Sequence, residues 1–303
     1  MSAGETIHEQ YQAALAALTE KLKRDSTVIA AVLLGSLAHD VVWEKSDIDL
    51  VVVTQEGKLR LQSVCLVENG INIHVSLMTR SEFRREMEGV AQGRTPLHYR
   101  SRLLYSRDET LHELFAHRDR VGGRDREASL LRMTTWLLPG LTKAEKWLRV
   151  KEDPDYCFVW IMNCLHAFAG ILVLLHGETP GRELLHQAKR HEPELVDAVY
   201  HRLIHGERGP NALNEAIELM RNTLLDRRDA IFGPVLEHLA EADGVRSTTA
   251  LNHHFEMHLG LHGLDGVYEW LADEGVLQKT GVALRLTDRS RTDVEEAAYF
   301  LPG

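Results

Sequence analysis

The stretch 33–53 constrains this chain most, because it joins two apolar runs through a glycine–serine pair and contains two closely spaced carboxylates. The runs are VIAAVLL (28–34) and IDLVVV (48–53), and both are typical of buried strands. Gly35-Ser36 follows the first run, ten residues intervene, and Asp47-Ile48-Asp49 opens the second. Because side chains alternate between the faces of a strand, both aspartates are predicted on one face of a sheet.

Two neighbouring carboxylates repel each other unless a cation neutralises them. Mg²⁺ suits such a pair, because it takes a few carboxylate oxygens and completes its octahedron with phosphate oxygens and water. The backbone N–H groups of Gly35 and Ser36, with the serine hydroxyl, can face a terminal phosphate, and glycine lets that phosphate approach. We therefore expect Gly35 and Ser36 to bind nucleotide, and Asp47 and Asp49 to bind the metal.

The Gly-Ser pair, the ten-residue spacer and the Asp-x-Asp resemble the signature of the DNA polymerase beta type nucleotidyltransferase superfamily. A minimal catalytic domain followed by a helical bundle is similar to the antibiotic nucleotidyltransferases that modify aminoglycosides and lincosamides. The resemblance implies an α+β fold with a mixed sheet, one or two Mg²⁺ ions, and ATP or another nucleoside triphosphate as substrate. Asp47 and Asp49 would hold the metal on the triphosphate while a small-molecule hydroxyl, such as that of a cationic antibiotic, attacks the α-phosphorus and pyrophosphate leaves.

The resemblance also implies a third acidic residue on a later strand, and the sequence departs from the pattern there. In the run 71–78 the apolar residues alternate with Asn72, His74 and Ser76, none of which is a carboxylate. Three interpretations stay open. His74 is a substitute general base, a glutamate from the hairpin or the helical domain, such as Glu68, completes the site, or the domain binds a nucleotide without chemistry.

The periodicity of residues 1–125 predicts a mixed domain of strands and helices. The expected elements, besides the two runs above, are helices at 7–24 and 81–88, the latter capped by Ser81, a hairpin of strands 59–67 and 71–78, and a short strand near 103–105. The block is expected to close near Gly122-Gly123. This is the predicted catalytic domain.

Residues 126–243 predict a helical bundle, because strand signals stop. Its expected helices are 127–150, broken at Pro139-Gly140, 155–176, 193–205, 211–231 and 234–242. Residues 244–303 resemble a winged-helix module, with two helices, a two-stranded wing within 276–288 and a final helix ending near Phe300. The chain is thus expected to hold three domains.

The bundle is expected to contribute to the nucleotide and acceptor sites. Lys143 and Lys146 are candidate phosphate ligands, although a solvated helix face explains them as well. Tyr156 and Trp160 are spaced to stack on a base or to lie in the core. Acidic residues that could attract a cationic acceptor follow at 152, 153, 155, 178, 183, 192 and 194.

The net charge and the cysteines limit the partners and the cellular location that we expect. The chain has 35 Lys and Arg against 45 Asp and Glu, a net charge of −10, which disfavours nucleic acid. Residues 245–303 carry five basic against nine acidic residues, so the winged-helix-like module is not expected to bind DNA. Three cysteines without framework spacing predict reduced thiols and a cytoplasmic protein. The uncharged run 158–175 is interpreted as the central helix of the bundle, not a membrane span. A homodimer is a further expectation.

Two other patterns are given less functional meaning. The histidines at 253, 254, 258 and 262 crowd one predicted helix, but no cysteine or HExxH pattern supports a transition-metal site. The bundle lacks the arginine–histidine spacing of a nuclease partner. Besides the transferase, the open functions are a catalytically inactive nucleotide-binding regulator and transfer of AMP to a protein hydroxyl.

Overall fold

The computed structural model describes residues 6–39, 42–88, 101–117, 123–181, 183–206, 208–242, 244–287, 289, 291 and 294–302. By its contacts the chain separates into two compact units, residues 1–90 with 94–120 and residues 91–93 with 121–303. Each unit has hydrophobic clusters of its own. The division into three domains at 125 and 243 stays a prediction, and the expected end of the first block at Gly122 lies outside the described residues.

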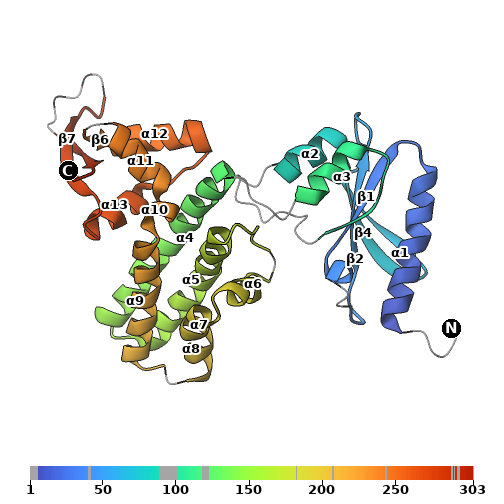
Figure 1. The fold of residues 1–303 in the computed structure, drawn as a ribbon, viewed down its shortest axis with the longest axis horizontal. Helices are drawn as coiled ribbons and strands as arrows, with labels where there is room; N and C mark the ends of the chain where they lie inside the picture. Colours follow the sequence, from blue (N-terminus) through green and yellow to red (C-terminus); the bar gives the residue numbers. More distant parts are fainter. Residues whose placement is uncertain are drawn as a thin grey trace. The chain divides into compact units, whose positions relative to one another are not determined.

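The first unit is built on a five-stranded mixed sheet (Figure 1). Its strands are β1 (Val28–Leu34), β2 (Ile48–Thr54), β3 (Ser63–Glu68), β4 (Ile71–Thr79) and β5 (Arg102–Ser106). Their order is β3-β4-β2-β1-β5, in which β2 and β4 run parallel and the other neighbours antiparallel. The two strands that carry the predicted site, β2 and β4, are therefore hydrogen-bonded neighbours.

Helices cover both faces of this sheet. The helix α1 (Ile7–Arg24) packs on one face through a cluster that includes Leu33, Ile48, Leu50, Ile73 and Val75. The helices α2 (Arg80–Glu88) and α3 (Glu109–His117) lie on the other, where Phe83, Leu111 and Phe115 cluster with Ala30, Val32, Val51 and Val53. Odd-numbered residues of β2 and even-numbered residues of β4 belong to this second face.

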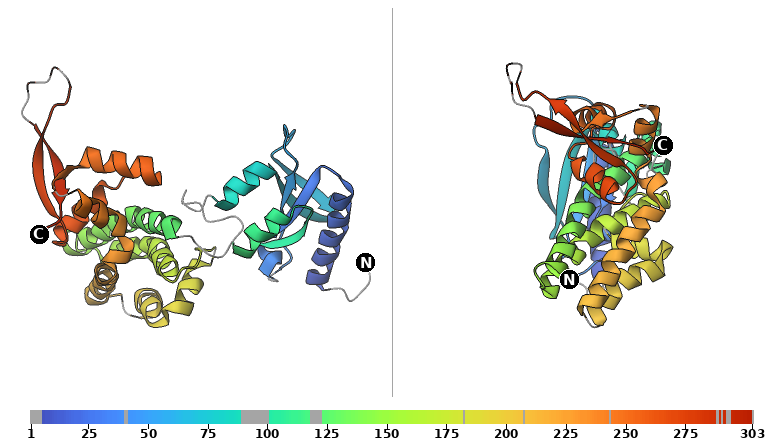
Figure 2. Two further views of the ribbon diagram at one scale, coloured as in Figure 1. Left: turned by 45° about the horizontal axis from the view of Figure 1, so that its top comes forward. Right: turned by 90° about the vertical axis from the view of Figure 1, so that its left-hand side faces the viewer.

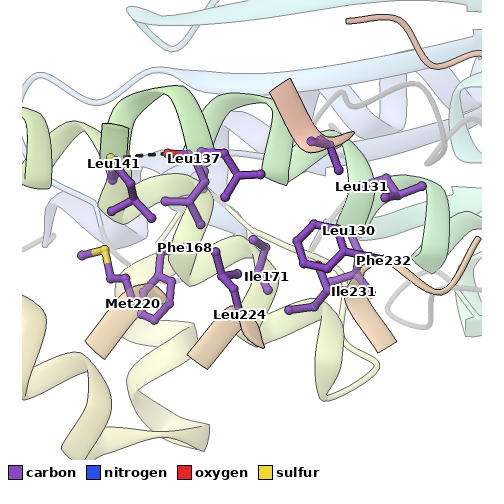
Figure 3. Close-up of a cluster of buried hydrophobic side chains, with 14 of the residues drawn as sticks. Leu130, Leu131, Leu137, Leu141, Phe168, Ile171, Met220, Leu224, Ile231 and Phe232 are labelled. Atoms are coloured by element: carbon purple, nitrogen blue, oxygen red, sulfur yellow. Dashed lines mark hydrogen bonds between the residues drawn. The ribbon is translucent and has the colours of Figure 1, made fainter. Parts of the chain in front are cut away.

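The second unit is a helical bundle followed by a small sheet. Its helices are α4 (Gly123–Arg149), α5 (Pro154–Leu175), α6 (Leu184–His191), α7 (Pro193–Val196), a π-helical turn (Asp197–His201), α8 (Arg202–His205), α9 (Pro210–Asp226), α10 (Arg228–Ile231) and α11 (Gly233–Glu241). Leucines of α4 meet Phe168 and Ile171 of α5, with Met220 and Leu224 of α9 beside them (Figure 3). One hydrophobic cluster runs from Ala128 to Tyr299, so the bundle and the C-terminal elements share a core.

The C-terminal elements follow the predicted order with two corrections. They are β6 (Arg246–Ser247), α12 (Thr248–Leu259), α13 (Asp265–Asp273), β7 (Gln278–Leu284) and β8 (Val294–Phe300). The final helix expected to end near Phe300 is instead β8, the central strand between β6 and β7 (Figure 2). The two-stranded wing expected within 276–288 is also wrong, because the described residues of that range form one strand, β7, which pairs with β8. Ala298 and Tyr299 of β8 are buried. The winged-helix assignment itself stays a prediction.

The predicted break at Pro139-Gly140 is wrong, because α4 continues through it. Proline has no backbone N–H, so one hydrogen bond of the helix is lost at Pro139. The Cys164 thiol of α5 donates a hydrogen bond to the carbonyl of Leu137. A Cβ at Gly140 would lie 2.5 Å from Cys164 Sγ, so glycine lets α4 and α5 approach closely here. This packing holds the helix together across the proline.

Other boundaries also differ from the sequence predictions. Thr79, not Ser81, caps α2, since Thr79 and Glu82 exchange hydrogen bonds as a capping box while Ser81 bonds to Glu56. The expected strand 59–67 begins only at Ser63, and the expected helix 211–231 is divided at Arg227. The helices α3 and α6 and the short strand β6 were not predicted.

The predicted central helix is confirmed as α5, within one residue of its expected bounds. Of the helices in the described part of the chain, this one is long and apolar enough to cross a membrane. Its most apolar eighteen residues are 61% buried within the structure. Such burial is what the core helix of a bundle shows.

Candidate active site

Gly35 ends β1 in a conformation that favours glycine. Its φ is +70°, in the left-handed region that L side chains rarely adopt. A Cβ at this position would lie 2.5 Å from Asp49 Oδ2, so glycine is required for contact with the carboxylate as well as for the turn. Ser36 follows, half-buried, as the first residue of a short 3-10 helix (Ser36–His39). The strand–turn–helix geometry predicted for the Gly-Ser pair is therefore present.

Asp47 and Asp49 lie on one face of the sheet, as predicted. Ile48 between them is buried against α1, and β2 alternates so that both aspartates face the side of α2 and α3. Asp49 is half-buried, with Leu34 of β1 opposite it on one side and His74 of β4 on the other. Asp47 precedes the strand, and its side chain is 47% exposed.

His74 lies near the Asp47 side chain and is the β4 neighbour of Asp49. Its Nε2 lies 3.5 Å from Asp47 Oδ2, its side chain is 54% exposed, and its backbone is in register with Asp49. The predicted face of Asn72, His74 and Ser76 is confirmed, since Ile73 and Val75 are buried on the other. The position on β4 beside Asp49 is thus held by an imidazole.

Glu68 cannot complete the site in this arrangement. It lies on β3 on the same face as Val64 and Leu66, which pack toward α1. Its Oε2 is 2.5 Å from Lys21 Nζ of α1. Since the aspartates face the opposite side of the sheet, Glu68 is separated from them by the sheet itself. Within the described ranges, no group of three or more His, Cys, Asp or Glu side chains is placed to hold a metal ion.

The region that contains these residues is similar to a known protein family. The family described as polymerase beta, nucleotidyltransferase, matches residues 16–110. Residues 16–110 are a polymerase beta type nucleotidyltransferase domain. A crystal structure of a nucleotidyltransferase-like protein from Exiguobacterium sibiricum is similar with a TM-score of 0.60 at 15% sequence identity, over 96% of this chain and 99% of that chain. At this identity the likeness shows the fold alone. No curated protein matches the chain.

The predicted phosphate ligands Lys143 and Lys146 lie outside the nucleotidyltransferase domain, on α4 of the second unit. Both are exposed. The Lys143 ammonium lies 4.5 Å from the ring centroid of Trp160, a cation–π contact. Tyr156 packs its ring against Trp147 at 4.3 Å between centroids. The two aromatics predicted to stack on a base thus contact other side chains of the bundle, and a nucleotide role for these residues stays a prediction.

Several acidic residues considered for a cationic acceptor have structural partners. Asp153 caps α5 by accepting from the Tyr156 N–H at 2.9 Å. Glu192 accepts two hydrogen bonds from Arg227, at 2.5 and 2.6 Å, which together with its other partners holds the pKa of Glu192 below its usual range. Glu178 bonds to Gln187 and His191. Three of the seven acidic residues considered for acceptor binding therefore have structural partners within the protein.

The crowded histidines also have neighbours. The rings of His254 and His258 lie 4.4 Å apart, and His254 stacks at 3.7 Å on His238 of α11. His262 Nδ1 lies 3.8 Å from Glu256 Oε1. Since no metal-binding group is found among the described residues, this cluster supplies no support for a transition-metal site.

Sequence reasoning missed four residues near Asp47. Tyr11 of α1 and Ser46 are joined by a hydrogen bond next to Asp47, and Trp43 is 61% exposed in the same loop. The Lys45 ammonium lies 5.6 Å from the Trp43 ring centroid. Tyr11 belonged to the predicted apolar stripe of its helix, and nothing in that periodicity indicates where its hydroxyl points.

Proposed function

We propose that the nucleotidyltransferase domain transfers a nucleoside monophosphate from Mg²⁺-bound ATP, or another nucleoside triphosphate, to a hydroxyl of a small molecule. In this reaction the hydroxyl oxygen forms a bond to the α-phosphorus, and the bond from that phosphorus to pyrophosphate breaks. The observation that carries the proposal is the pair Asp47 and Asp49 on one face beside the Gly35 turn.

The donor set fits one Mg²⁺ ion. Asp47 and Asp49 offer hard oxygen ligands, and Mg²⁺ is commonly held by one or two carboxylates together with substrate phosphates. When bound, the ion would neutralise phosphate charge and orient the triphosphate. The third neighbour, His74, offers a nitrogen that Mg²⁺ does not favour. A second ion therefore has weaker support than the first.

Each neighbouring residue has a proposed role. The Gly35 and Ser36 N–H groups and the Ser36 hydroxyl would bind the terminal phosphate. His74 lies beside both aspartates and would accept the proton of the attacking hydroxyl, because a neutral imidazole is a suitable general base near pH 7. The proton then resides on His74 until solvent takes it. This role predicts loss of turnover with retained nucleotide binding in His74→Ala.

The first experiment is calorimetric titration of the four nucleoside triphosphates into the protein, with and without Mg²⁺. We expect micromolar binding with Mg²⁺ and weaker, still measurable binding without it, and we expect Mg²⁺ to give no gain in affinity in Asp47→Ala/Asp49→Ala. Glu20→Ala removes one exposed carboxylate of α1 on the opposite side of the sheet, so it is the charge control for the single variant Asp49→Ala and should bind normally. Unchanged metal-dependent binding in Asp49→Ala would contradict the proposed site.

A second candidate is a nucleotide-binding regulator without catalysis. The observation that favours it is the imidazole of His74 where the family pattern implies a carboxylate. The two candidates differ in products, since a transferase releases pyrophosphate when an acceptor is supplied and a regulator does not. We would screen acceptors from cationic antibiotics outward. Metal-dependent nucleotide binding by the wild type without pyrophosphate release across small-molecule and protein acceptors would favour the regulator.

The remaining expectations enter as parts of the proposal. The acceptor class, a protein hydroxyl as an alternative acceptor, a cytoplasmic location and a homodimer rest on the sequence arguments alone. Lys143 and Lys146 are included as phosphate ligands on the same basis. Replacing both by alanine is expected to weaken nucleotide binding if they reach the triphosphate.

A further inference from the structure

Tyr11 has a buried ring, and its hydroxyl group lies at the edge of the hydrophobic core. Its ring lies on α1 in the cluster formed with Ala14, Leu15 and the inner residues of the sheet, and only 7% of the residue is exposed. Its hydroxyl donates a hydrogen bond to the backbone carbonyl of Ser46, 35 residues further along the chain. The helix that covers the far face of the sheet is thus bonded to the loop that leads into the acidic site.

Ser46 is fixed by more than this bond. Its N–H donates to the Trp43 carbonyl at 2.9 Å, and its hydroxyl accepts from the Trp43 N–H at 3.1 Å. With Tyr11, the amide, the carbonyl and the side chain of Ser46 are each hydrogen-bonded. This set of contacts closes the turn 43–46 immediately before Asp47.

Asp47 itself has little to hold it. The paired register of β2 begins at Ile48 with β4 and at Asp49 with β1, so Asp47 lies outside the ladder. Its side chain is 47% exposed and lies 3.5 Å from the His74 imidazole. Its backbone is therefore fixed on one side by buried Ile48 and on the other by Ser46, and Tyr11 supplies the bond that reaches Ser46 from outside the loop.

We infer that Tyr11 is a positioning residue for Asp47, acting through the Ser46 carbonyl. The inference rests on the proposed function, because Asp47 matters there as a ligand of the nucleotide-bound Mg²⁺. A carboxylate that is held in place before the metal binds loses less conformational freedom on binding it. Removing the Tyr11 hydroxyl should therefore lower the affinity for ATP in the presence of Mg²⁺. A purely structural hydroxyl would change stability and leave that affinity unaltered.

Tyr11→Phe keeps the ring in the core and removes only the hydroxyl. Tyr105→Phe is the matched control, because Tyr105 packs against the same cluster and its buried hydroxyl has no hydrogen-bond partner among the described residues. The dissociation constant of ATP would be measured by calorimetry at saturating Mg²⁺ and again in EDTA. Thermal unfolding of both variants reports on stability.

In Mg²⁺, Tyr11→Phe is expected to raise the ATP dissociation constant about three- to tenfold, the effect of one hydrogen bond. The constant in EDTA should be unchanged, and Tyr105→Phe should match the wild type in both conditions. In an Asp47→Asn background, Tyr11→Phe should have no further effect. If Tyr11→Phe does not fold, Ser46→Ala tests the same turn by removing the bond from the Trp43 N–H, with the same expected split between Mg²⁺ and EDTA.

Wild-type affinity in Mg²⁺ for Tyr11→Phe, or equal losses in Mg²⁺ and EDTA, would overturn the inference and leave the proposed function standing. A wild type that binds ATP no better with Mg²⁺ than without it would overturn both. The two failures are therefore distinguishable from the wild-type titration alone.

Discussion

The contact between Gly35 and Asp49 makes a single methyl group a sharp probe of the site. Gly35→Ala would place a Cβ 2.5 Å from the Asp49 carboxylate, and would also strain a backbone at φ +70°. We expect destabilisation of about 1–2 kcal/mol from the left-handed backbone. Displacement of Asp49 should weaken Mg²⁺-dependent nucleotide binding by about tenfold or more. Urea unfolding and calorimetric titration measure the two effects.

Gly70→Ala separates these effects. Gly70 has a φ of +80° in the turn between β3 and β4, and a Cβ there would meet nothing within 4 Å. It should show a similar loss of stability with normal nucleotide affinity. Equal affinities in the two variants would show that the Asp49 contact is unimportant.

The three cysteine thiols should react at very different rates. Cys65 is exposed, whereas burial raises the pKa of Cys157 to about 11 and that of Cys164 to about 12. Because the thiolate is the nucleophile, only about one buried thiol in a thousand or fewer is reactive at pH 8. We expect one fast thiol in the native protein and three after denaturation, measured with a chromogenic disulfide reagent. Cys65→Ser should abolish the fast phase, and any fast thiol that remains in that variant would contradict the assigned burial.

Cys65 also reports on the site, because it pairs with His74 across β3 and β4. Under the proposed function, Mg²⁺ with ATP should slow its modification. The Asp47→Ala/Asp49→Ala variant is the control and should show no protection. Protection that persists in this variant would place the nucleotide elsewhere.

At the scale of elements, the period of two was enough to place the aspartates and His74 on one face of neighbouring strands. The same reasoning failed for α4 and β8, where tertiary contacts override local preference. Pro139 predicts a break, but the close approach of Gly140 to Cys164 holds the helix. The run Val294–Phe300 has helix-forming residues, yet pairing with β6 and β7 makes it a strand. Such pairing depends on distant segments that periodicity does not identify.

The packing of α11 against α12 predicts a pH-dependent stability. Burial, with Arg246 and His258 adding smaller effects and Glu241 opposing them, lowers the pKa of His238; burial and the neighbouring histidines lower that of His254. These rings are therefore neutral in the folded protein at a pH where they begin to take protons in the unfolded chain. Because the unfolded state then binds more protons, the free energy of unfolding should fall as the pH drops below about 6.5.

Urea unfolding followed by tryptophan fluorescence between pH 7.5 and pH 5 would measure this effect, and His254→Gln would isolate it. The variant should lose part of the pH dependence, because one of the two stacked rings no longer titrates. His253→Gln, which replaces an exposed histidine on the same helix, is the control and should keep the wild-type dependence. Identical slopes for wild type and His254→Gln would contradict the assignment.

At the scale of the whole molecule, sequence reasoning predicted a nucleotidyltransferase-type domain, which the family comparison supports, and a bundle of helices, which the structure shows. It gave no account of how the helices and strands of residues 121–303 pack together. The shared cluster from Ala128 to Tyr299 combines side chains from the bundle and the C-terminal sheet. Individual apolar residues of both regions were visible in the sequence. Which of them meet is decided by helix crossings and by the placement of β8, and neither follows from local spacing.

The charge of the whole chain leads to a last prediction, on nucleic acid. The net charge is −10, and α13, the helix that a winged helix would place in the major groove, carries Asp265, Glu269 and Asp273 without a basic residue. Each of these carboxylates would face phosphates of the same sign. We expect no saturable complex with a labelled DNA duplex at micromolar protein and physiological salt, measured by fluorescence anisotropy with and without Mg²⁺ and ATP.

Charge reversal tests the physical reason. Glu269→Lys/Asp273→Lys should gain weak, sequence-independent binding that falls steeply as salt rises, because lysines near phosphates release counterions. A tight wild-type complex that responds to ATP would overturn the prediction and favour the regulatory candidate, since it would require contacts strong enough to overcome the charge of the entire molecule. Failure of both proteins to bind would show that α13 does not reach the groove at all, so that its acidic face belongs to packing or to another partner.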